Sequence, residues 1–168
     1  ATLAVSLASI KASAKLEGKE LYAYLSSGHV SMPIPMINII NGGAHADNNL
    51  DIQEFMIVPI VKGMHERVRI ASEVFHTLKS ILKAQGLATS VGDEGGFAPN
   101  LEYNNLALDL IMEAIEKSGY TPGVEVCIAL DVAASEIYDA KTKTYKIDGR
   151  SLTSDELVKY YVALVNKY

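Results

Sequence analysis

The sequence of 168 residues lacks the features that define several protein classes. Its single cysteine, Cys127, excludes an intrachain disulfide framework and favours a reducing compartment. With 20 acidic against 15 basic residues and no dense basic cluster, a nucleic-acid backbone is not expected as the main partner. Lys11 and Lys15 interrupt the early apolar run, which therefore predicts neither a signal peptide nor a membrane span. We expect a soluble, cytoplasmic globular chain.

Common catalytic signatures are also missing. The sequence has no G-x-G-x-x-G, G-x-x-x-x-G-K-[ST], G-x-S-x-G or C-x-x-C motif. Cys127 lies inside an apolar run, which indicates packing and not a nucleophile. Residues 47–51 begin like a calcium loop, but Ile52 occupies the position where such a loop needs glycine. The chemistry must therefore come from other residues.

What the sequence does contain is regular apolar periodicity, with 49% hydrophobic residues. Three- and four-residue spacing predicts helices, period-two or continuous apolar runs predict strands, and Thr153 with Glu156 forms a capping box. The predicted helices cover 1–17, 64–85, 104–118 and the residues from 153 onward, with a short turn at 20–25. The predicted strands cover 36–40, 53–59, 89–91 and 126–130, with a hairpin within 135–147.

The alternation of these elements predicts an α/β fold with a mostly parallel sheet, either a barrel or an open doubly wound sheet. The uninterrupted apolar run 126–130 is typical of a parallel strand covered on both faces. The proline-rich stretch 32–35 is the best boundary between domains. Both ends of the chain lie within helical patterns without stop signals, so we expect the chain to be part of a longer one.

Ionisable residues gather where the predicted strands end. Residues 41–47 follow the first strand, Asp93 and Glu94 follow the strand near 90, and Asp131 follows the run 126–130. In parallel α/β folds the loops at the carboxyl ends of the strands converge and form the active site. The sequence therefore predicts a polar site at this end of the sheet.

Asp131 is the clearest metal-ligand candidate. It follows five apolar residues, so we expect its carboxylate to be partly buried and to need a cation or backbone donors. No histidine pair or thiolate accompanies it, so oxygen coordination of Mg²⁺ fits better than Zn²⁺. The alternative is a strand-end aspartate that caps the next turn.

Glu94 lies in a glycine-rich segment, G-D-E-G-G, that has too little bulk to serve as core. Its glycines allow the backbone to bend around a ligand, and Asp93 is a possible electrostatic partner for an acid at Glu94. The alternative is a solvated acidic turn. His45 is either a site residue or a surface histidine, and Gln53 with Glu54 are either ligands or polar residues at a strand edge.

Four segments, in this order and spacing, resemble the enolase family of glycolytic 2-phosphoglycerate dehydratases. The similarity runs through nearly the whole chain, and these long motifs are highly specific. The segments are 38–49 (NIINGGAHADNN), 51–57 (DIQEFMI), 91–100 (VGDEGGFAPN) and 129–136 (ALDVAASE).

The resemblance implies a Mg²⁺-dependent lyase that interconverts 2-phosphoglycerate and phosphoenolpyruvate in glycolysis and gluconeogenesis. Enolase-superfamily sites use a Lys or His base with one or two Mg²⁺ ions that stabilise an enediolate. The resemblance implies that Glu94 is the catalytic acid/base and that Asp131 is a Mg²⁺ ligand. It further implies that His45, Gln53 and Glu54 contact the substrate.

The resemblance also implies the fold and the domains. Residues 1–31 would be the last helices of an N-terminal α+β domain, and residues 32–168 the first part of an enolase-type (β/α)8 barrel. The family's Lys base, its other two Mg²⁺ carboxylates and its phosphate ligands would lie beyond this chain. We therefore expect the 168 residues alone to be inactive and poorly folded, because an open barrel exposes unpaired strand edges.

Two alternatives to the complete glycolytic enzyme remain at this point. One is a surface or secreted module that binds plasminogen, through the lysine-containing segment 136–145, although the loose match there favours a solvated hairpin. The other is an acid-sugar dehydratase or racemase of the same superfamily, against which the 91–100 motif argues. By analogy with the family we expect a homodimer or a larger homo-oligomer.

Overall fold

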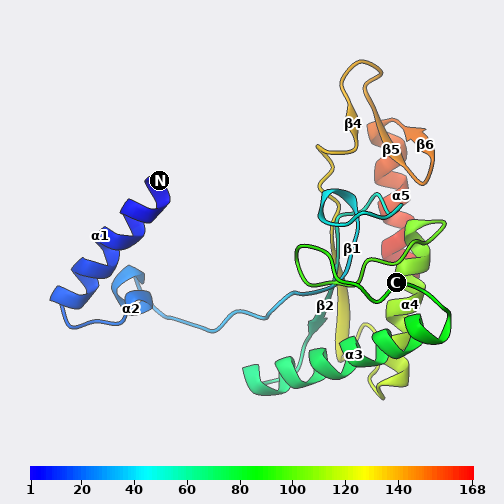
Figure 1. The fold of residues 1–168 in the computed structure, drawn as a ribbon. Helices are drawn as coiled ribbons and strands as arrows, with labels where there is room; N and C mark the ends of the chain where they lie inside the picture. The colour runs from blue at the N-terminus through cyan, green and yellow to red at the C-terminus, as the bar shows by residue number, and fades with distance from the viewer. The chain divides into compact units, whose positions relative to one another are not determined.

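The computed structural model describes all 168 residues, which form two compact units, Ala1–Pro33 and Ile34–Tyr168 (Figure 1). The first unit contains α1 (Thr2–Leu16) and α2 (Leu21–Leu25). The predicted helix over 1–17 is confirmed, and it ends before Gly18, whose φ of +64° suits a residue without a side chain. Its expected apolar face is not buried: within α1 only Ala14 is buried, and Leu3 is 71% exposed.

The second unit contains two three-stranded sheets, three longer helices and one short 3₁₀ turn (Figure 1). The predicted helices of this part are confirmed, with ends that shift by a residue or two. In chain order the elements are β1 (Ile37–Asn41), η1 (Gly43–His45), β2 (Glu54–Pro59), α3 (Met64–Ala84), α4 (Asn104–Lys117), β3 (Val126–Asp131), β4 (Tyr138–Asp139), β5 (Thr144–Ile147), β6 (Arg150–Leu152) and α5 (Ser154–Lys167).

The larger sheet has the order β1-β2-β3, and both of its pairs are antiparallel. The prediction of a mostly parallel sheet is wrong here, because residues 42–53 supply no crossover helix and the chain returns directly. β1 and β3 still run in the same direction, and β2 runs between them in the opposite one. The start of β2 therefore lies beside the ends of β1 and β3.

The predicted strand at 89–91 is not formed as an element. Val91 and Phe97 make an isolated antiparallel bridge, and Phe97 bridges Ile40 of β1 in parallel. The amide of Phe97 donates to the carbonyl of Ile39 at 2.9 Å, and the amide of Asn41 donates to the carbonyl of Phe97 at 2.9 Å. Residues 91–97 thus lie along β1 and carry the glycine-rich segment with them.

The core of the second unit lies between the larger sheet and the helices α3 and α4, which pack against each other. Phe75 of α3 stacks on Phe97 with ring centroids 4.3 Å apart, which ties the 91–97 segment to the helix layer. The amphipathic spacing of both helices explains their position, because their apolar sides supply most of the helical core. These side chains are Ile70, Ala71, Val74, Leu78, Ile81, Leu82, Ala107, Leu108, Leu110, Ile111, Ala114 and Ile115.

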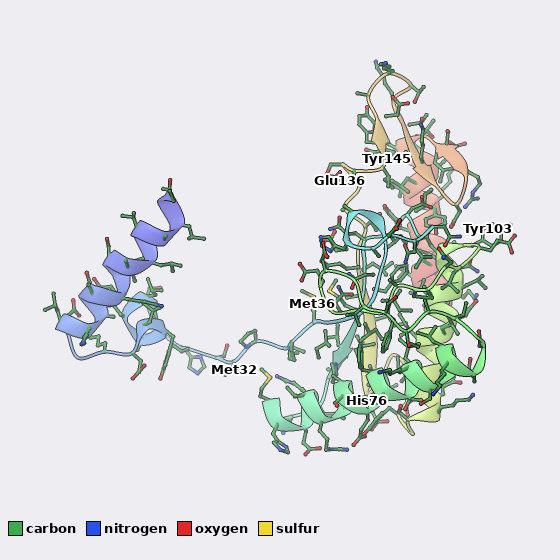
Figure 2. The ribbon with its side chains drawn as sticks, in the orientation of Figure 1. Met32, Met36, His76, Tyr103, Glu136 and Tyr145 are labelled. Carbon is green, nitrogen blue, oxygen red and sulfur yellow. The ribbon has the colours of Figure 1, made fainter.

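The smaller sheet has the order β4-β5-β6 and contains the predicted hairpin within 135–147. Figure 2 shows Glu136 before the hairpin and Tyr145 on β5, where Tyr145 pairs with Tyr138 of β4. The capping box of Thr153 and Glu156 at the start of α5 is confirmed. Local signals therefore predicted this part of the chain correctly.

β3 differs from its prediction as a strand covered on both faces, because only Val126 of its six residues is buried. Ile128 and Leu130 line an apolar groove of about 330 Å³ together with Tyr161 and Leu164 of α5. β3 pairs on one side only, so the barrel is not closed by these residues. No helix combines the length and the apolar character that crossing a membrane requires.

Candidate functional site

The strand register brings polar residues together at one end of the larger sheet. Glu54, at the start of β2, lies opposite Asn41 at the end of β1 and opposite Asp131 at the end of β3. Directly opposite residues of an antiparallel pair project to the same face, with Cβ atoms about 5 Å apart. Because β2 is antiparallel, its first residue joins an edge formed by the last residues of its neighbours.

The 92–96 loop packs tightly against this end of β1. Asn41 is fully buried, and its Oδ1 accepts a hydrogen bond from the amide of Gly96 at 2.8 Å. A Cβ atom on Gly96 would lie 2.6 Å from that oxygen, and one on Gly92 would lie 2.4 Å from the carbonyl oxygen of His45. These two glycines serve close packing of protein against protein, whereas the sequence suggested that they bend around a ligand.

The docked loop places Glu94 beside His45 and Glu54. One ligating atom from each of the three side chains lies within 4.8 Å of the other two. The Nδ1 atom of His45 is 3.4 Å from Oε1 of Glu54, and the two side chains are 24% and 19% exposed. Glu94 is exposed, so its carboxyl group can exchange a proton with solvent. The arrangement offers an acid/base group next to two partly buried polar partners.

His45 has an unusual hydrogen-bonding state within this cluster. Its Nδ1 atom is buried, yet it makes no hydrogen bond, because the approach to Glu54 does not have hydrogen-bond geometry. Buried polar atoms are nearly always paired in folded proteins. The backbone of His45 is well held, since its carbonyl accepts a hydrogen bond from the amide of Asp93 at 3.0 Å. The imidazole is therefore positioned but unsatisfied.

Asp131 does not have the predicted partial burial. Its side chain is exposed, and Oδ1 accepts a hydrogen bond from the amide of Ala133 at 2.9 Å, which is the turn-capping alternative. The reason is that β3 is the edge strand and no further strand shields its end. The carboxylate still suits Mg²⁺, which takes oxygen ligands, and it faces the same side as Glu54.

Gln53 lies at the same end of the sheet as the three-residue cluster. It is half-buried, its carbonyl accepts a hydrogen bond from the amide of Gly42 at 3.0 Å, and it lines a cavity of about 260 Å³ with Gly43 and Val132. Asp93, by contrast, is exposed and is not part of the cluster. Glu54, and not Asp93, is thus the acidic residue that the structure brings to Glu94.

A buried polar network beside the site was not predicted from the sequence. Asn104 is 1% exposed, and its Oδ1 accepts hydrogen bonds from the amides of Asp51 and Ile52, both at 3.0 Å. Its Nδ2 donates to Oδ1 of Asp148 at 2.7 Å and to Oδ2 of Asp51 at 3.1 Å. The hydroxyl of Tyr160 donates to the other oxygen of Asp148 at 2.9 Å.

This network fixes the segment that leads into Gln53 and Glu54. Burial, together with the hydrogen bond to Asp148, raises the pKa of Tyr160 far above its ordinary value, so the phenol remains a donor. The only sequence signal was the position of Asn104 at a predicted helix start. Nothing local indicated a partner 44 residues away.

A known protein family matches the second unit and the residues just before it. The family described as "Enolase, C-terminal TIM barrel domain" matches residues 29–168. The match covers most of the chain, including all the residues of the site described above.

Proposed function

Since this chain belongs to the enolase family, whose fold suggests a lyase-type enzyme, we propose that the intact protein interconverts 2-phosphoglycerate and phosphoenolpyruvate. By intact protein we mean the polypeptide in the length in which cells make it. The observation that carries the proposal is the convergence of His45, Glu54 and Glu94 at the sheet end that also bears Asp131. The reaction would serve glycolysis and gluconeogenesis.

Glu94 is the residue to which we assign proton transfer at C3 of the substrate. Dehydration removes a proton from C2 and a hydroxyl group from C3, and the hydroxyl leaves as water when an acid protonates it. A carboxyl group on an exposed loop can regain its proton from solvent after each turnover. The docking of Gly92 and Gly96 on Asn41 and His45 holds that loop in place. The resemblance to the family assigns removal of the C2 proton to a lysine base, and the cluster of His45, Glu54 and Glu94 contains no lysine.

His45, Gln53 and Glu54 are assigned to substrate contacts. His45 and Glu54 are partly buried side chains that face Glu94, and Gln53 lines the adjacent cavity. Such groups fix the orientation of a small polar ligand while keeping water away from it. Their supporting shell is the network of Asn104 and Asp51, which fixes the backbone immediately before Gln53.

Asp131 is assigned as a ligand of Mg²⁺. When bound, Mg²⁺ would neutralise negative charge that develops on the substrate carboxylate during loss of the C2 proton. One carboxylate does not make a tight octahedral site, so other carboxylates, the substrate and water would supply the remaining oxygen ligands. Asp131 contributes an exposed carboxylate on the same sheet face as Glu54.

The test is Mg²⁺-dependent formation of phosphoenolpyruvate from 2-phosphoglycerate by the intact protein. We expect activity that chelation of Mg²⁺ abolishes, and an Asp131→Asn variant that needs at least about tenfold more Mg²⁺ for half-maximal rate. Asp155→Asn, an exposed aspartate on α5, is the control. Turnover of an acid sugar without any phosphoenolpyruvate would instead favour the acid-sugar dehydratase or racemase.

The remaining expectations from the sequence concern the domains, the location, the oligomeric state and a second partner. We propose that residues 1–31 belong to a preceding α+β domain, that the intact protein is a cytoplasmic homodimer or larger homo-oligomer, and that plasminogen is a secondary partner. The support for the last is limited to Lys141 and Lys143, which are exposed at the turn between β4 and β5. Binding of immobilised plasminogen that a Lys141→Ala, Lys143→Ala variant loses would test it.

A further inference from the structure

We propose that Asp148, in the turn between β5 and β6, is a positioning residue that orients Gln53 and Glu54 toward the substrate. This inference rests on the proposed function, because it concerns how the substrate is held. Asp148 belongs to the smaller sheet, whereas Gln53 and Glu54 lie at one end of the larger sheet. The two are nonetheless connected, since the backbone amide of Asp148 donates to Oδ2 of Asp51 at 2.7 Å, across 97 positions of the chain.

The carboxylate of Asp148 is buried, with 7% of the side chain exposed, and protein groups satisfy both of its oxygens. Oδ1 accepts hydrogen bonds from the backbone amide of Asn104 at 2.8 Å and from its Nδ2 at 2.7 Å. Oδ2 accepts a hydrogen bond from the hydroxyl of Tyr160 at 2.9 Å, and the guanidinium of Arg150 is 3.8 Å from the same oxygen. Several donors around one buried carboxylate fix it in a single orientation.

Asn104 transmits this orientation to the segment before β2. Its Nδ2 donates to both Asp148 and Asp51, which leaves Oδ1 facing the backbone amides of Asp51 and Ile52. These amides immediately precede Gln53 in the chain. Without the carboxylate of Asp148, the Nδ2 group would be held by Asp51 alone. The carboxamide would then be free to tilt, and the backbone that leads into Gln53 would lose its fixed position.

The turn at Asp148 allows its side chain to be changed without changing the backbone. Asp148 and Gly149, with φ of +49° and +68°, form a two-residue loop between the paired residues Ile147 and Arg150. Asp-Gly, Asn-Gly and Gly-Gly all suit a hairpin loop of this kind. Asp148→Gly therefore removes the carboxylate and keeps the turn. Asp148→Asn keeps both the turn and an acceptor oxygen for Asn104.

The experiment measures the steady-state kinetics of the intact protein with 2-phosphoglycerate. We expect Asp148→Gly to raise KM about 3–30-fold and to leave kcat within about twofold, because the loop of Glu94 docks on β1 through contacts outside this network. Asp148→Asn should restore most of the lost affinity. A purely structural role would instead reduce the amount of folded enzyme, which lowers the apparent kcat and leaves KM unchanged. That result would overturn the proposal.

The matched control for the carboxylate is Asp139→Gly. Asp139 also lies at a turn of the smaller sheet, but its Oδ1 accepts hydrogen bonds from the amides of Lys141 and Thr142, at 2.9 and 3.4 Å, within that same turn. We expect this variant to keep the KM of the unmodified protein. An increase in KM equal to that of Asp148→Gly would mean that the effect has no connection with the Asn104 network, and it would overturn the proposal.

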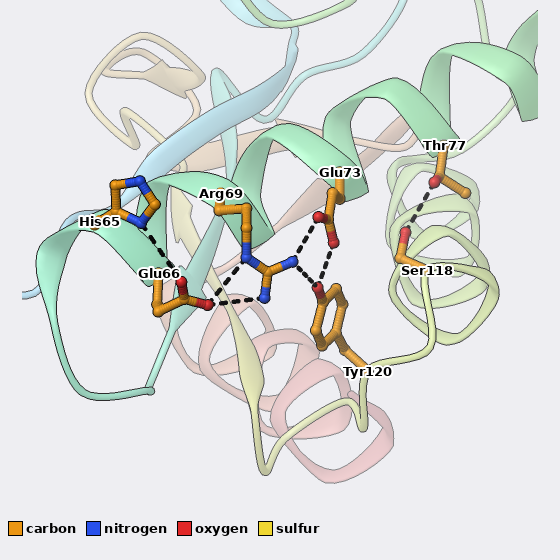
Figure 3. Close-up of polar contacts among 7 residues, drawn as sticks. All are labelled: His65, Glu66, Arg69, Glu73, Thr77, Ser118 and Tyr120. Carbon is orange, nitrogen blue, oxygen red and sulfur yellow. Dashed lines mark hydrogen bonds and ion pairs between the residues drawn. The ribbon is translucent and has the colours of Figure 1, made fainter.

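A second pair of variants tests the network while Asp148 itself stays in place. Tyr160→Phe removes the hydroxyl that donates to Asp148, and we expect it to raise KM. Tyr120→Phe is the matched control, because the hydroxyl of Tyr120 also donates to a carboxylate, that of Glu73 on α3, in a surface cluster that contains no residue of the site (Figure 3). We expect no change in KM for this control. Equal KM values for the two variants would contradict the proposal, even if Asp148→Gly does not fold.

Amide hydrogen exchange distinguishes this inference from the proposed reaction. The amides of Asp51 and Ile52 donate to Asn104, so we expect them to exchange faster in Asp148→Gly than in Asp139→Gly, with or without catalytic activity. This exchange pattern in a protein that forms no phosphoenolpyruvate would defeat the dehydratase proposal and keep the link from Asp148 to the segment before Gln53. An active enzyme in which Asp148→Gly changes neither KM nor exchange would defeat the positioning role alone.

Discussion

Two loops at the same end of the larger sheet satisfy their polar groups in opposite ways. Residues 48–52 are held from within, since Asn104 accepts hydrogen bonds from two of their amides and donates to Asp51. Residues 92–96 are held only through their backbone groups, one of which donates to Oδ1 of buried Asn41, while Glu94 stays exposed and its neighbour His45 keeps an unpaired Nδ1. Saturated hydrogen bonding gives the first loop rigidity, and the unsatisfied groups beside the second are free to act on a ligand.

The largest expected effect comes from a substitution in the second loop, residues 92–96. Glu94→Gln removes the proposed acid while keeping the size of the side chain, so we expect the turnover number of the intact protein to fall about 10²–10⁴-fold. The free energy of unfolding should change by less than about 0.5 kcal/mol, because the side chain is exposed. Steady-state kinetics and denaturant titration measure both quantities. Near-normal turnover would remove Glu94 from the mechanism.

The reverse pattern is expected at the first loop. Asn104→Ala deletes hydrogen bonds to Asp51, Ile52 and Asp148 and leaves buried polar groups without partners. We expect the free energy of unfolding to fall by about 2–4 kcal/mol, with any effect on activity arising through displacement of Gln53 and Glu54. Denaturant titration measures it. Asn105→Ala is the matched control, and equal destabilisation by the two variants would show that the network contributes little.

Gly96 is where the second loop packs most closely against the end of β1. Gly96→Ala would place a Cβ atom 2.6 Å from Oδ1 of buried Asn41, so the loop or the strand end must shift. We expect destabilisation of about 1–3 kcal/mol and a parallel loss of turnover, because Glu94 moves with the loop. Gly28→Ala meets no neighbouring atom and serves as control. Full activity together with full stability would mean that close packing of this loop is unnecessary.

Features that depend on residues close together in the sequence could be predicted, whereas features that depend on distant segments could not. The helix over 64–85 and the capping box at Thr153 depend on neighbours within four residues, and both are confirmed. The direction of β2 and the exposure of Asp131 depend on which strands pair, which local periodicity does not encode. Motif similarity pointed to the site residues. The pairing of Asn104 with Asp148 had no local signal, because it joins segments that are distant in the chain.

The smallest expected effect concerns the capping box at the start of α5, where Thr153 and Glu156 satisfy each other's hydrogen-bonding groups at the surface. A hydrogen bond from the backbone amide of Thr153, at 2.8 Å, and one from its hydroxyl, at 2.9 Å, lower the pKa of Glu156 below its ordinary value. A carboxyl group with a lowered pKa in the folded state stabilises that state above its unfolded pKa. This contribution is lost as the pH falls through the folded-state pKa.

We therefore expect the difference in unfolding free energy between the unmodified protein and Glu156→Ala to be present at neutral pH and to shrink in acid. Denaturant titrations of both proteins at neutral pH and at about pH 3 measure it. Asp155→Asn, a change in the same helical turn at a side chain outside the capping box, should show a weaker pH dependence. A difference for Glu156→Ala that stays constant over this range would mean that ionised Glu156 does not stabilise α5. The exposed hydrogen bonds of the capping box would then contribute no stability through the charge of Glu156, in contrast to the contribution expected from the buried hydrogen bonds of Asn104.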